Sequence, residues 1–201
     1  KRNLKLNSMS NNLRISGGQL RGIRLSVKSN IVKPTSENVR QSLFNIIDVR
    51  GTKFLDVFAG SGIVGIEAIS RGADFVCFIE KNYSLSNQIN QNLSRISIEK
   101  TKFKVINSDW KKGFDILENE GIKFNIIFLD PFYNFEEYFN LVKDSKKLLE
   151  KKGTIILEAS SRRISAITQS LGGFEDIRTY GDTSLVFITY GIDTSISNQN
   201  S

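Results

Sequence analysis

The segment Phe54–Gly65 constrains the fold of this chain more than any other stretch. It opens with a short apolar run, broken only by Asp56, of the kind that forms a parallel strand buried on both faces. Three glycines with the spacing G-x-G-x-x-G follow, at Gly60, Gly62 and Gly65, and their missing side chains let a ligand and a helix approach the backbone. The segment therefore predicts a strand, a glycine turn and a helix. Three interpretations of the turn stay open here: a dinucleotide pyrophosphate site, a site for another adenosyl compound, or no ligand site.

Strands and helices alternate through the rest of the chain. Apolar runs predict further strands at residues 74–80, 103–106, 124–129, 154–158, 174–180 and 184–190. Apolar residues at helical spacing predict helices at residues 63–70, 82–94, 110–117, 136–149 and 162–171. This alternation indicates an α/β protein with a doubly wound, mostly parallel, seven-stranded sheet of Rossmann-like type, in which the last two strands form an antiparallel hairpin at the edge.

The first forty residues are strongly basic. They hold nine Lys and Arg side chains against the single acidic residue Glu37, whereas the other 161 residues hold nineteen basic and twenty acidic side chains. Counterion release favours Lys and Arg beside phosphates, so this asymmetry predicts a polyanionic partner; a solvated basic tail is the alternative. The candidate substrate contacts are Arg14, Arg21, Arg24, Lys33, Thr35 and Arg40.

Three regions follow from these patterns. Residues 1–50 are predicted to form a basic extension, with a small hairpin over residues 13–25 and a helix that begins at Pro34 with Thr35 or Ser36 and carries Arg40 on its exposed face. Residues 51–192 are predicted to form the main domain. The polar tail, residues 193–201, is expected to be disordered.

Composition excludes several kinds of chemistry. Histidine is absent, which rules out Ser-His and Cys-His nucleophile pairs and a histidine-ligated metal, and no metal is expected. Cys77 is the only cysteine, so no disulfide can form within the chain, and its apolar surroundings predict a buried thiol. No stretch is apolar for long enough to span a bilayer, and no signal-peptide pattern is present, so we expect a soluble, cytoplasmic protein.

Carboxylates stand at the predicted C-terminal ends of five successive strands. They are Asp56, Glu80, Asp109, Asp130 and Glu158. Doubly wound sheets bind ligands beyond these ends, near the point where the strand order reverses. A single strand-end carboxylate is commonplace, but five at corresponding positions predict a ligand site.

Three of these carboxylates suit an adenosyl ligand. Glu80 lies at the right distance from the glycine turn to accept hydrogen bonds from both ribose hydroxyls, a role found with nicotinamide dinucleotides and with S-adenosylmethionine. Asp56 would repel a pyrophosphate but attract the ammonium group of a methionine moiety, which favours S-adenosylmethionine. Asp109 is positioned to accept a hydrogen bond from an adenine amine, with Ser108 and Trp110 beside it. Trp110 has packing in the core as its alternative role.

The tetrapeptide Asp130-Pro131-Phe132-Tyr133 predicts methylation of an exocyclic amine. The lone pair of such an amine is delocalised into its base, and hydrogen bonds from the NH2 group to the Asp130 side chain and the Pro131 carbonyl would pull the nitrogen toward tetrahedral geometry. Stacking on an aromatic ring would then hold the plane of the base. The alternative is a turn that begins with Asp-Pro, followed by two core aromatic residues.

The chain resembles the bacterial 16S ribosomal RNA guanine-N2 methyltransferases, the small-subunit enzymes that modify guanine 966, which have the class I S-adenosylmethionine-dependent fold. The resemblance extends from about residue 14 to residue 190. It is carried by residues 14–18, 21–22, 33–35, 39–45, 55–62, 65, 67–68, 70–73, 130–131 and 180–183. One difference is Phe132, which stands where the family usually has a second proline, so that either Phe132 or Tyr133 is a candidate to stack on the base.

The resemblance implies a cofactor, a partner and a set of site residues. The cofactor is S-adenosylmethionine, and the partner is 16S ribosomal RNA, within a small-subunit particle or an assembly intermediate, bound by a monomer. The implied catalytic residues are Asp130, Pro131, Phe132 and Tyr133. The implied cofactor contacts are Asp56, Phe58, Ala59, Gly60, Ser61, Gly62, Glu80, Lys81, Ser108, Asp109 and Trp110.

Other functions stay open. The same tetrapeptide serves adenine-N6 and protein-amine methyltransferases. The glycine spacing and Glu80 also fit a nicotinamide-dependent oxidoreductase, against which Asp56 and Asp130 argue. A non-catalytic RNA-binding module would explain the basic extension but gives no reason for Asp130-Pro131 at a strand end.

Overall fold

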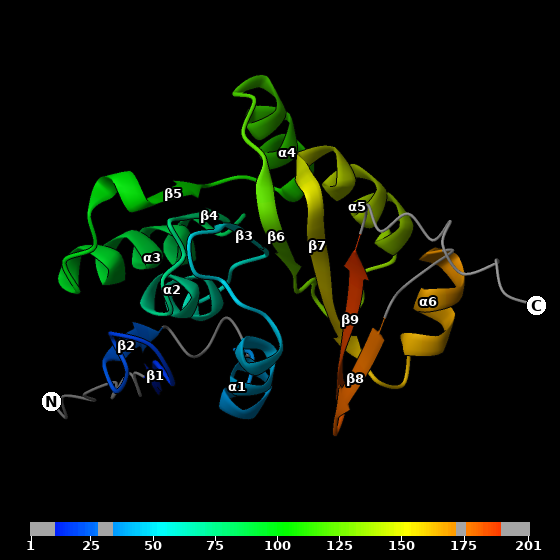
Figure 1. Cartoon of the computed structure of the whole chain (residues 1–201), viewed down its shortest axis with the longest axis horizontal. Coiled ribbons are helices and arrows are strands. Elements are labelled where there is room, and N and C mark those ends of the chain that lie inside the picture. Colours follow the sequence, from blue (N-terminus) through cyan, green and yellow to red (C-terminus); the bar gives the residue numbers. More distant parts are fainter. Residues whose placement is uncertain (1–10, 28–33, 172–175, 190–201) are drawn as a thin grey trace, which may run out of the picture.

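The structure is a computed structural model that describes residues 11–27, 34–171 and 176–189. Its main sheet has the strands β3 (Lys53–Val57), β4 (Phe75–Ile79), β5 (Phe103–Ile106), β6 (Phe124–Leu129), β7 (Leu149–Ser160), β8 (Asp176–Tyr180) and β9 (Thr183–Thr189). They lie in the order β5-β4-β3-β6-β7-β9-β8 (Figure 1). The first five pair in parallel, and β9 is antiparallel to both β7 and β8. The predicted seven-stranded, doubly wound sheet with an antiparallel edge is confirmed.

The helices cover both faces of this sheet. They are α1 (Glu37–Ile46), α2 (Ile63–Ser70), α3 (Tyr83–Arg95), α4 (Trp110–Asn119), α5 (Tyr138–Ser145) and α6 (Ile164–Leu171), with 3-10 turns at Lys100–Lys102 and Lys146–Leu148. Among the described residues, no helix is both long and apolar enough to cross a bilayer. The predicted helix over 136–149 was too long, because β7 begins at Leu149. Residues 150–152 of β7 are exposed and charged, so this part of the strand lacks the alternation of apolar and polar residues that would have predicted it.

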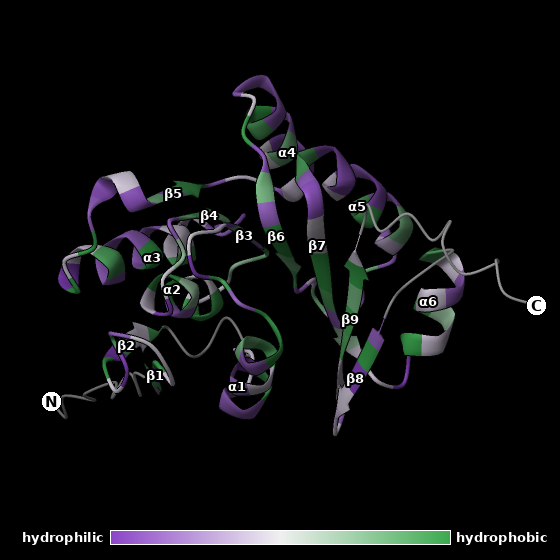
Figure 2. Cartoon of the chain, in the orientation of Figure 1, coloured by the Kyte–Doolittle hydropathy of each residue, from purple (hydrophilic) through white to green (hydrophobic). Residues whose placement is uncertain are grey.

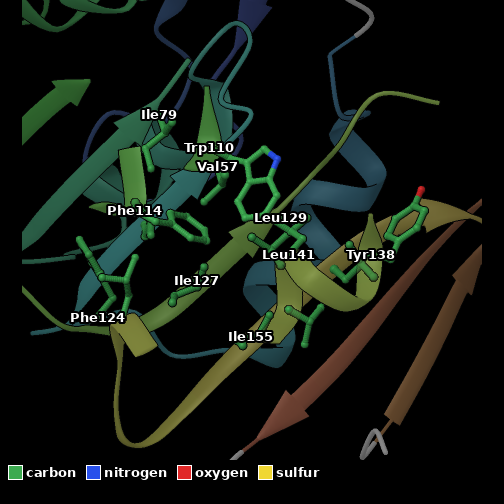
Figure 3. Packing of buried hydrophobic residues seen from close by; sticks show 14 of the residues in the cluster. Val57, Ile79, Trp110, Phe114, Phe124, Ile127, Leu129, Tyr138, Leu141 and Ile155 are labelled. Carbon is green, nitrogen blue, oxygen red and sulfur yellow. The ribbon is translucent and has the colours of Figure 1, made fainter. Parts of the chain in front are cut away.

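Two apolar cores lie on opposite faces of the sheet, because neighbouring residues of a strand point to opposite sides. Leu55 faces the core beneath α4, α5 and α6, where Phe114 and Leu141 are buried (Figure 3). Phe54 faces the core beneath α1, α2 and α3, with Leu43 and Ile66. Figure 2 shows the matching pattern, with apolar residues concentrated along the strands and polar residues on the outer turns of the helices. Cys77 is buried in the first core, as predicted.

The glycine turn brings α2 against the sheet. Phe58, Gly60 and Gly62 all have positive φ angles, of 63°, 54° and 74°, so the chain reverses within five residues. Gly65 serves packing: a Cβ added there would lie 2.3 Å from the Phe78 ring. The third glycine of the motif therefore sets the distance between α2 and β4.

Replacing Gly65 with alanine is expected to lower the free energy of unfolding by about 1–3 kcal/mol, because the added methyl group forces α2 and the Phe78 ring apart. Urea denaturation measures the loss. The double variant Gly65→Ala/Phe78→Leu should recover part of it, since leucine removes the ring atoms that the methyl group meets. Equal stability of Gly65→Ala and the wild type would contradict the packing role.

The N-terminal extension packs against the main domain. Its hairpin pairs β1 (Asn11–Arg14) with β2 (Arg24–Val27) in antiparallel register. The connecting loop bonds to the end of α2, where the Gln19 amide donates to the Ser70 carbonyl at 2.7 Å. The Asn92 side chain on α3 exchanges hydrogen bonds with the backbone of Ser26 in β2. Helix α1 is capped by the Ser36 hydroxyl, which confirms the predicted helix start.

Arg40 does not lie on the exposed face of α1, and this prediction was wrong. It is 1% exposed, and its guanidinium donates to the Glu67 carboxylate at 3.2 Å, the Thr35 carbonyl at 2.7 Å and the Arg14 carbonyl at 2.9 Å. Glu67 is fully buried and also pairs with Arg71 at 2.9 Å. Arg40 therefore ties α1, the hairpin and α2 together.

Candidate active site

The predicted strand-end carboxylates gather at one edge of the sheet. Asp56, Glu80, Asp109, Asp130 and Glu158 all line cavities there. A larger cavity of about 880 Å³ lies over β3, β4, β6 and the start of α4, and a smaller cavity of about 440 Å³ lies over the ends of β6 and β7. A third, small recess lies beside the glycine turn and is lined by Asp56 and Asp130. Asp130 also lines both cavities.

The larger cavity holds most of the predicted cofactor contacts. Phe58, Gly60, Glu80, Lys81, Ser108, Asp109 and Trp110 line it. Asp56, Ala59 and Ser61 line the recess instead. Gly62 lines none of these three spaces; it is the left-handed residue that starts α2.

Glu80 is held rigidly at the wall of the larger cavity. One carboxylate oxygen accepts from the Gly60 amide at 2.7 Å, and the other accepts from the Asn82 amide at 2.7 Å. A carboxylate has about four acceptor sites, so capacity remains for two hydroxyl donors. The glycine turn thus fixes this carboxylate where a ribose could be recognised.

Asp109 and Trp110 stand at the start of α4 and also line the larger cavity. Asp109 is the helix cap, with Oδ1 accepting from the Lys112 amide at 3.1 Å. Trp110 is 7% exposed and packs edge to face on Phe114 at 5.4 Å, while it also lines the cavity. Trp110 is therefore a core residue that also forms a wall of the cavity, and its contact with a ligand stays a prediction.

The segment Asp130–Tyr133 separates the two cavities. Asp130, Pro131 and Tyr133 line both, whereas Phe132 lines only the larger one. Phe132 and Tyr133 are 65% and 70% exposed, so neither is a core residue. The alternative of a plain turn with buried aromatic residues is excluded on this point.

Neighbouring aromatic residues and one arginine support this segment. Phe132 packs edge to face on Phe135 at 5.6 Å, and Phe135 contacts Phe58 at 5.5 Å. Arg163 donates to the Tyr133 carbonyl at 2.6 Å and to the Phe135 carbonyl at 3.1 Å. Arg163 could not be predicted from the sequence, because no local pattern connects it to a loop thirty residues earlier.

The extension reaches the smaller cavity. Pro34, Thr35 and Ser36 line it together with Glu158, and the Thr35 hydroxyl donates to Asp130 Oδ2 at 3.3 Å. Of the other predicted substrate contacts, Arg14, Arg21 and Arg24 are exposed on the hairpin, and Lys33 lies outside the described residues. The buried Arg40 contributes only by holding Thr35.

Burial and mutual repulsion disfavour the charges in this site. Burial raises the pKa of Asp56 well above its ordinary value, and the charges of Asp130 and Glu80 raise it further. The Gly65 amide, which donates to Asp56 at 2.9 Å, lowers this pKa and offsets part of the rise. Burial also raises the pKa of Asp130, partly offset by the Thr35 hydroxyl. Burial and the charge of Asp130 raise the pKa of Glu158. A cation bound here would relieve this repulsion.

These raised pKa values predict that the ligand-free protein becomes less stable as pH rises. From about pH 4 upward the folded state binds more protons than the unfolded state, so the free energy of unfolding falls until the raised pKa values are passed. Urea midpoints between pH 5 and pH 8.5 should decline, and Glu158→Gln should flatten the decline. Asp48 has a lowered pKa of about 2, so it changes the pH dependence of stability only below pH 5. A midpoint that rises with pH would contradict the electrostatic account.

Comparison with known proteins identifies the family. A family model described as conserved hypothetical protein 95 matches residues 13–189. Ribosomal RNA small subunit methyltransferase D of Escherichia coli (strain K12) is 36% identical over 153 residues, which cover 72% of this chain and 73% of that protein. The putative rRNA methyltransferase YlbH of Bacillus subtilis (strain 168) is 31% identical over 151 residues, covering 73% and 82% of the two chains.

Solved structures share the fold. The putative methyltransferase yhhF from Escherichia coli superposes with a TM-score of 0.71 and 28% identity, covering 90% of this chain and 98% of that one. The sequence match and the shared fold extend over most of the chain. The chain therefore belongs to the conserved hypothetical protein 95 family and to the family of ribosomal RNA small subunit methyltransferase D.

Proposed function

We propose that this protein transfers a methyl group from S-adenosylmethionine to the exocyclic N2 amine of a guanine in 16S ribosomal RNA, of the guanine-966 type. The observation that carries this proposal is the position of Asp130, Pro131 and Tyr133 between two cavities. A methyl donor in the larger cavity and a base in the smaller one would meet at these residues. The names of the relatives support ribosomal RNA as the substrate class.

The chemistry of the larger cavity suits S-adenosylmethionine. The cofactor supplies an electrophilic methyl group on a positively charged sulfur. Glu80 would accept from the ribose hydroxyls and Asp109 from the adenine amine, while the cluster of Asp56 with Asp130 and Glu80 favours a cation. The same cluster would repel the pyrophosphate of a nicotinamide dinucleotide.

Asp130 and Pro131 would hold the acceptor amine. The Asp130 carboxylate and the Pro131 carbonyl each accept one N–H bond, which turns the nitrogen lone pair out of the plane of the base and toward the methyl group. When the new N–C bond forms, the nitrogen becomes positively charged and one of its protons must leave. The raised pKa of Asp130 makes its carboxylate a better acceptor for that proton. No imidazole is needed.

The exposed arginines of the hairpin would bind RNA phosphates. Arg14, Arg21 and Arg24 are exposed, and Thr35 connects the extension to Asp130. The extension would thus bind RNA phosphates next to the domain that holds the target base. Monomeric state, an assembling particle as substrate, the absence of a metal and a cytoplasmic location stay predictions.

The double variant Arg21→Glu/Arg24→Glu is expected to weaken RNA binding by about tenfold or more at low salt and to reduce the slope of log affinity against log salt, because phosphate contacts are lost. Filter binding over a salt series measures both quantities. Arg50→Glu is the matched control, since Arg50 is an exposed arginine outside the extension hairpin. Unchanged affinity and slope in the double variant would rule out these phosphate contacts.

Two assays distinguish the proposal from its alternatives. Calorimetry should detect binding of S-adenosylmethionine and none of NAD; the opposite result would favour an oxidoreductase. With labelled S-adenosylmethionine and 16S RNA, the label should appear in N2-methylguanosine after nuclease digestion. Label in N6-methyladenosine or in protein would assign a different amine methyltransferase, and RNA binding without transfer would indicate a non-catalytic module.

A further inference from the structure

Glu158, near the C-terminal end of β7, has no role in the mechanism described so far. In the parallel pairing of β6 with β7, Leu129 lies opposite Leu157, so the next residues, Asp130 and Glu158, lie side by side. Asp130 follows the end of β6, whereas Glu158 still belongs to β7 and pairs with Leu185 of β9. Both line the smaller cavity. Oε2 of Glu158 is buried and has no hydrogen-bond partner among the described residues. Such an atom is costly in a folded protein, and it indicates a partner that the protein does not itself supply.

The smaller cavity is suited to a nucleobase. Its volume of about 440 Å³ lies in the range of small-ligand pockets. Tyr133 lines it and, at 70% exposed, offers a ring face for stacking, while the buried Tyr138 forms part of its wall. Thr35 lines it beside Asp130. Glu158 lines the same cavity and, next to Asp130, borders the place where the reacting amine would sit.

We propose that Glu158 is a second base-contacting residue, whose carboxyl hydrogen-bonds to the target base beside the amine that Asp130 holds. The inference rests on the proposed function and deepens it, because it assigns a residue that recognises the ring next to the reacting amine.

The surroundings of Glu158 favour its protonated form. Burial raises the pKa of this carboxyl, and the charges of Asp130 and Asp56 raise it further, while the Thr35 hydroxyl and the charge of Arg40 lower it. The other titratable groups that line the cavity are Tyr133, Tyr138, Arg162 and Asp182. A protonated carboxyl is a hydrogen-bond donor. Guanine offers the acceptor N3 on one side of its N2 amine and the donor N1–H on the other, so Glu158 would donate to N3.

Two variants test the contact. Glu158→Ala is expected to lower kcat/KM for RNA by about tenfold to a hundredfold, with the Kd for S-adenosylmethionine unchanged. Glu158→Gln keeps an N–H donor of similar shape and should restore most of the activity. It should also lack the wild-type loss of kcat/KM at alkaline pH, where Glu158 deprotonates. Activity of Glu158→Gln as low as that of Glu158→Ala would overturn the donor role.

Urea denaturation of both variants shows whether a loss of activity reflects a loss of folded protein. Both variants remove a buried carboxyl with an unpaired oxygen, so their urea midpoints should equal or exceed that of the wild type. Glu150→Gln, an exposed glutamate on the same strand, is the matched control and should behave as the wild type.

RNA altered at one atom gives the decisive test. 16S RNA ligated from synthetic segments would carry 3-deazaguanosine, which lacks the N3 acceptor, at the target position. The wild type and Glu158→Ala should then act on it at equal rates, although they differ by about tenfold to a hundredfold on guanosine RNA. The same ratio on both RNAs would overturn the N3 contact. Failure of the wild type to methylate guanosine RNA would instead contradict the proposed function, and the inference with it.

Discussion

Replacing Asp130 with alanine is expected to lower the rate of methyl transfer to RNA by about a thousandfold, while S-adenosylmethionine still binds with nearly unchanged affinity. The carboxylate would hold the amine in its reactive geometry and accept its proton, so both contributions disappear together. The proposed cofactor contacts are Glu80, just after β4, and Asp109, the cap of α4, and their hydrogen bonds do not involve Asp130. Single-turnover assays with labelled cofactor, combined with calorimetry, measure the two quantities.

Asp130→Asn makes the test sharper, because the amide preserves the shape and can still present an oxygen to the amine but cannot take its proton. It should show an intermediate rate, and it should fold at least as well as the wild type, since burial disfavours the charge at this position. Asp115→Asn, at an exposed position on α4, is the control. Activity of Asp130→Ala within about tenfold of the wild type would remove Asp130 from the catalytic site.

Replacing Arg40 with alanine is expected to lower the free energy of unfolding by about 3 kcal/mol, because it leaves the buried Glu67 carboxylate with less compensation. The estimate is at the lower end for buried pairs, since Arg71 still neutralises Glu67 at 2.9 Å. Urea denaturation measures the change. The loss should also release Thr35 and so lower activity at temperatures where the variant remains folded.

Arg50→Ala is the matched control for Arg40. Arg50 also pairs with a carboxylate, Asp48, at 2.5 Å, but the two side chains are 79% and 59% exposed. Its removal should leave the urea midpoint unchanged, because exposed ion pairs contribute little. The double variant Arg40→Met/Glu67→Gln should be more stable than Arg40→Ala, since it removes the fully buried Glu67 charge together with that of Arg40. Arg71 loses its carboxylate partner, but its side chain is 20% exposed and keeps contact with water. Equal stability of Arg40→Ala and the wild type would contradict the account of this cluster.

The main-domain elements could be predicted because their patterns are local. The strands Phe103–Ile106 and Phe124–Leu129 and the helix Ile63–Ser70 have the predicted bounds. The two strands are short, mostly apolar runs of the kind typical of a parallel sheet, and polar residues bound them. The edge at which the carboxylates gather follows from the alternation of strands and helices.

Contacts between distant residues could not be predicted. Arg40 was assigned to the surface because arginine is usually exposed, and its partner Glu67 lies 27 residues away. Thr35 and Asp130 are separated by 95 residues. Glu158 was recognised as a strand-end carboxylate, but its position beside Asp130 depends on the adjacency and register of β6 and β7.

Mapping of modified nucleotides tests the central proposal most directly. 16S RNA from cells that lack the protein would be compared with wild-type RNA by mass spectrometry of nuclease fragments. The account predicts that one N2-methylguanosine is missing, and that the wild-type gene restores it whereas Asp130→Ala does not. An unchanged set of 16S modifications, or the loss of a methyl group from a different base, would contradict it.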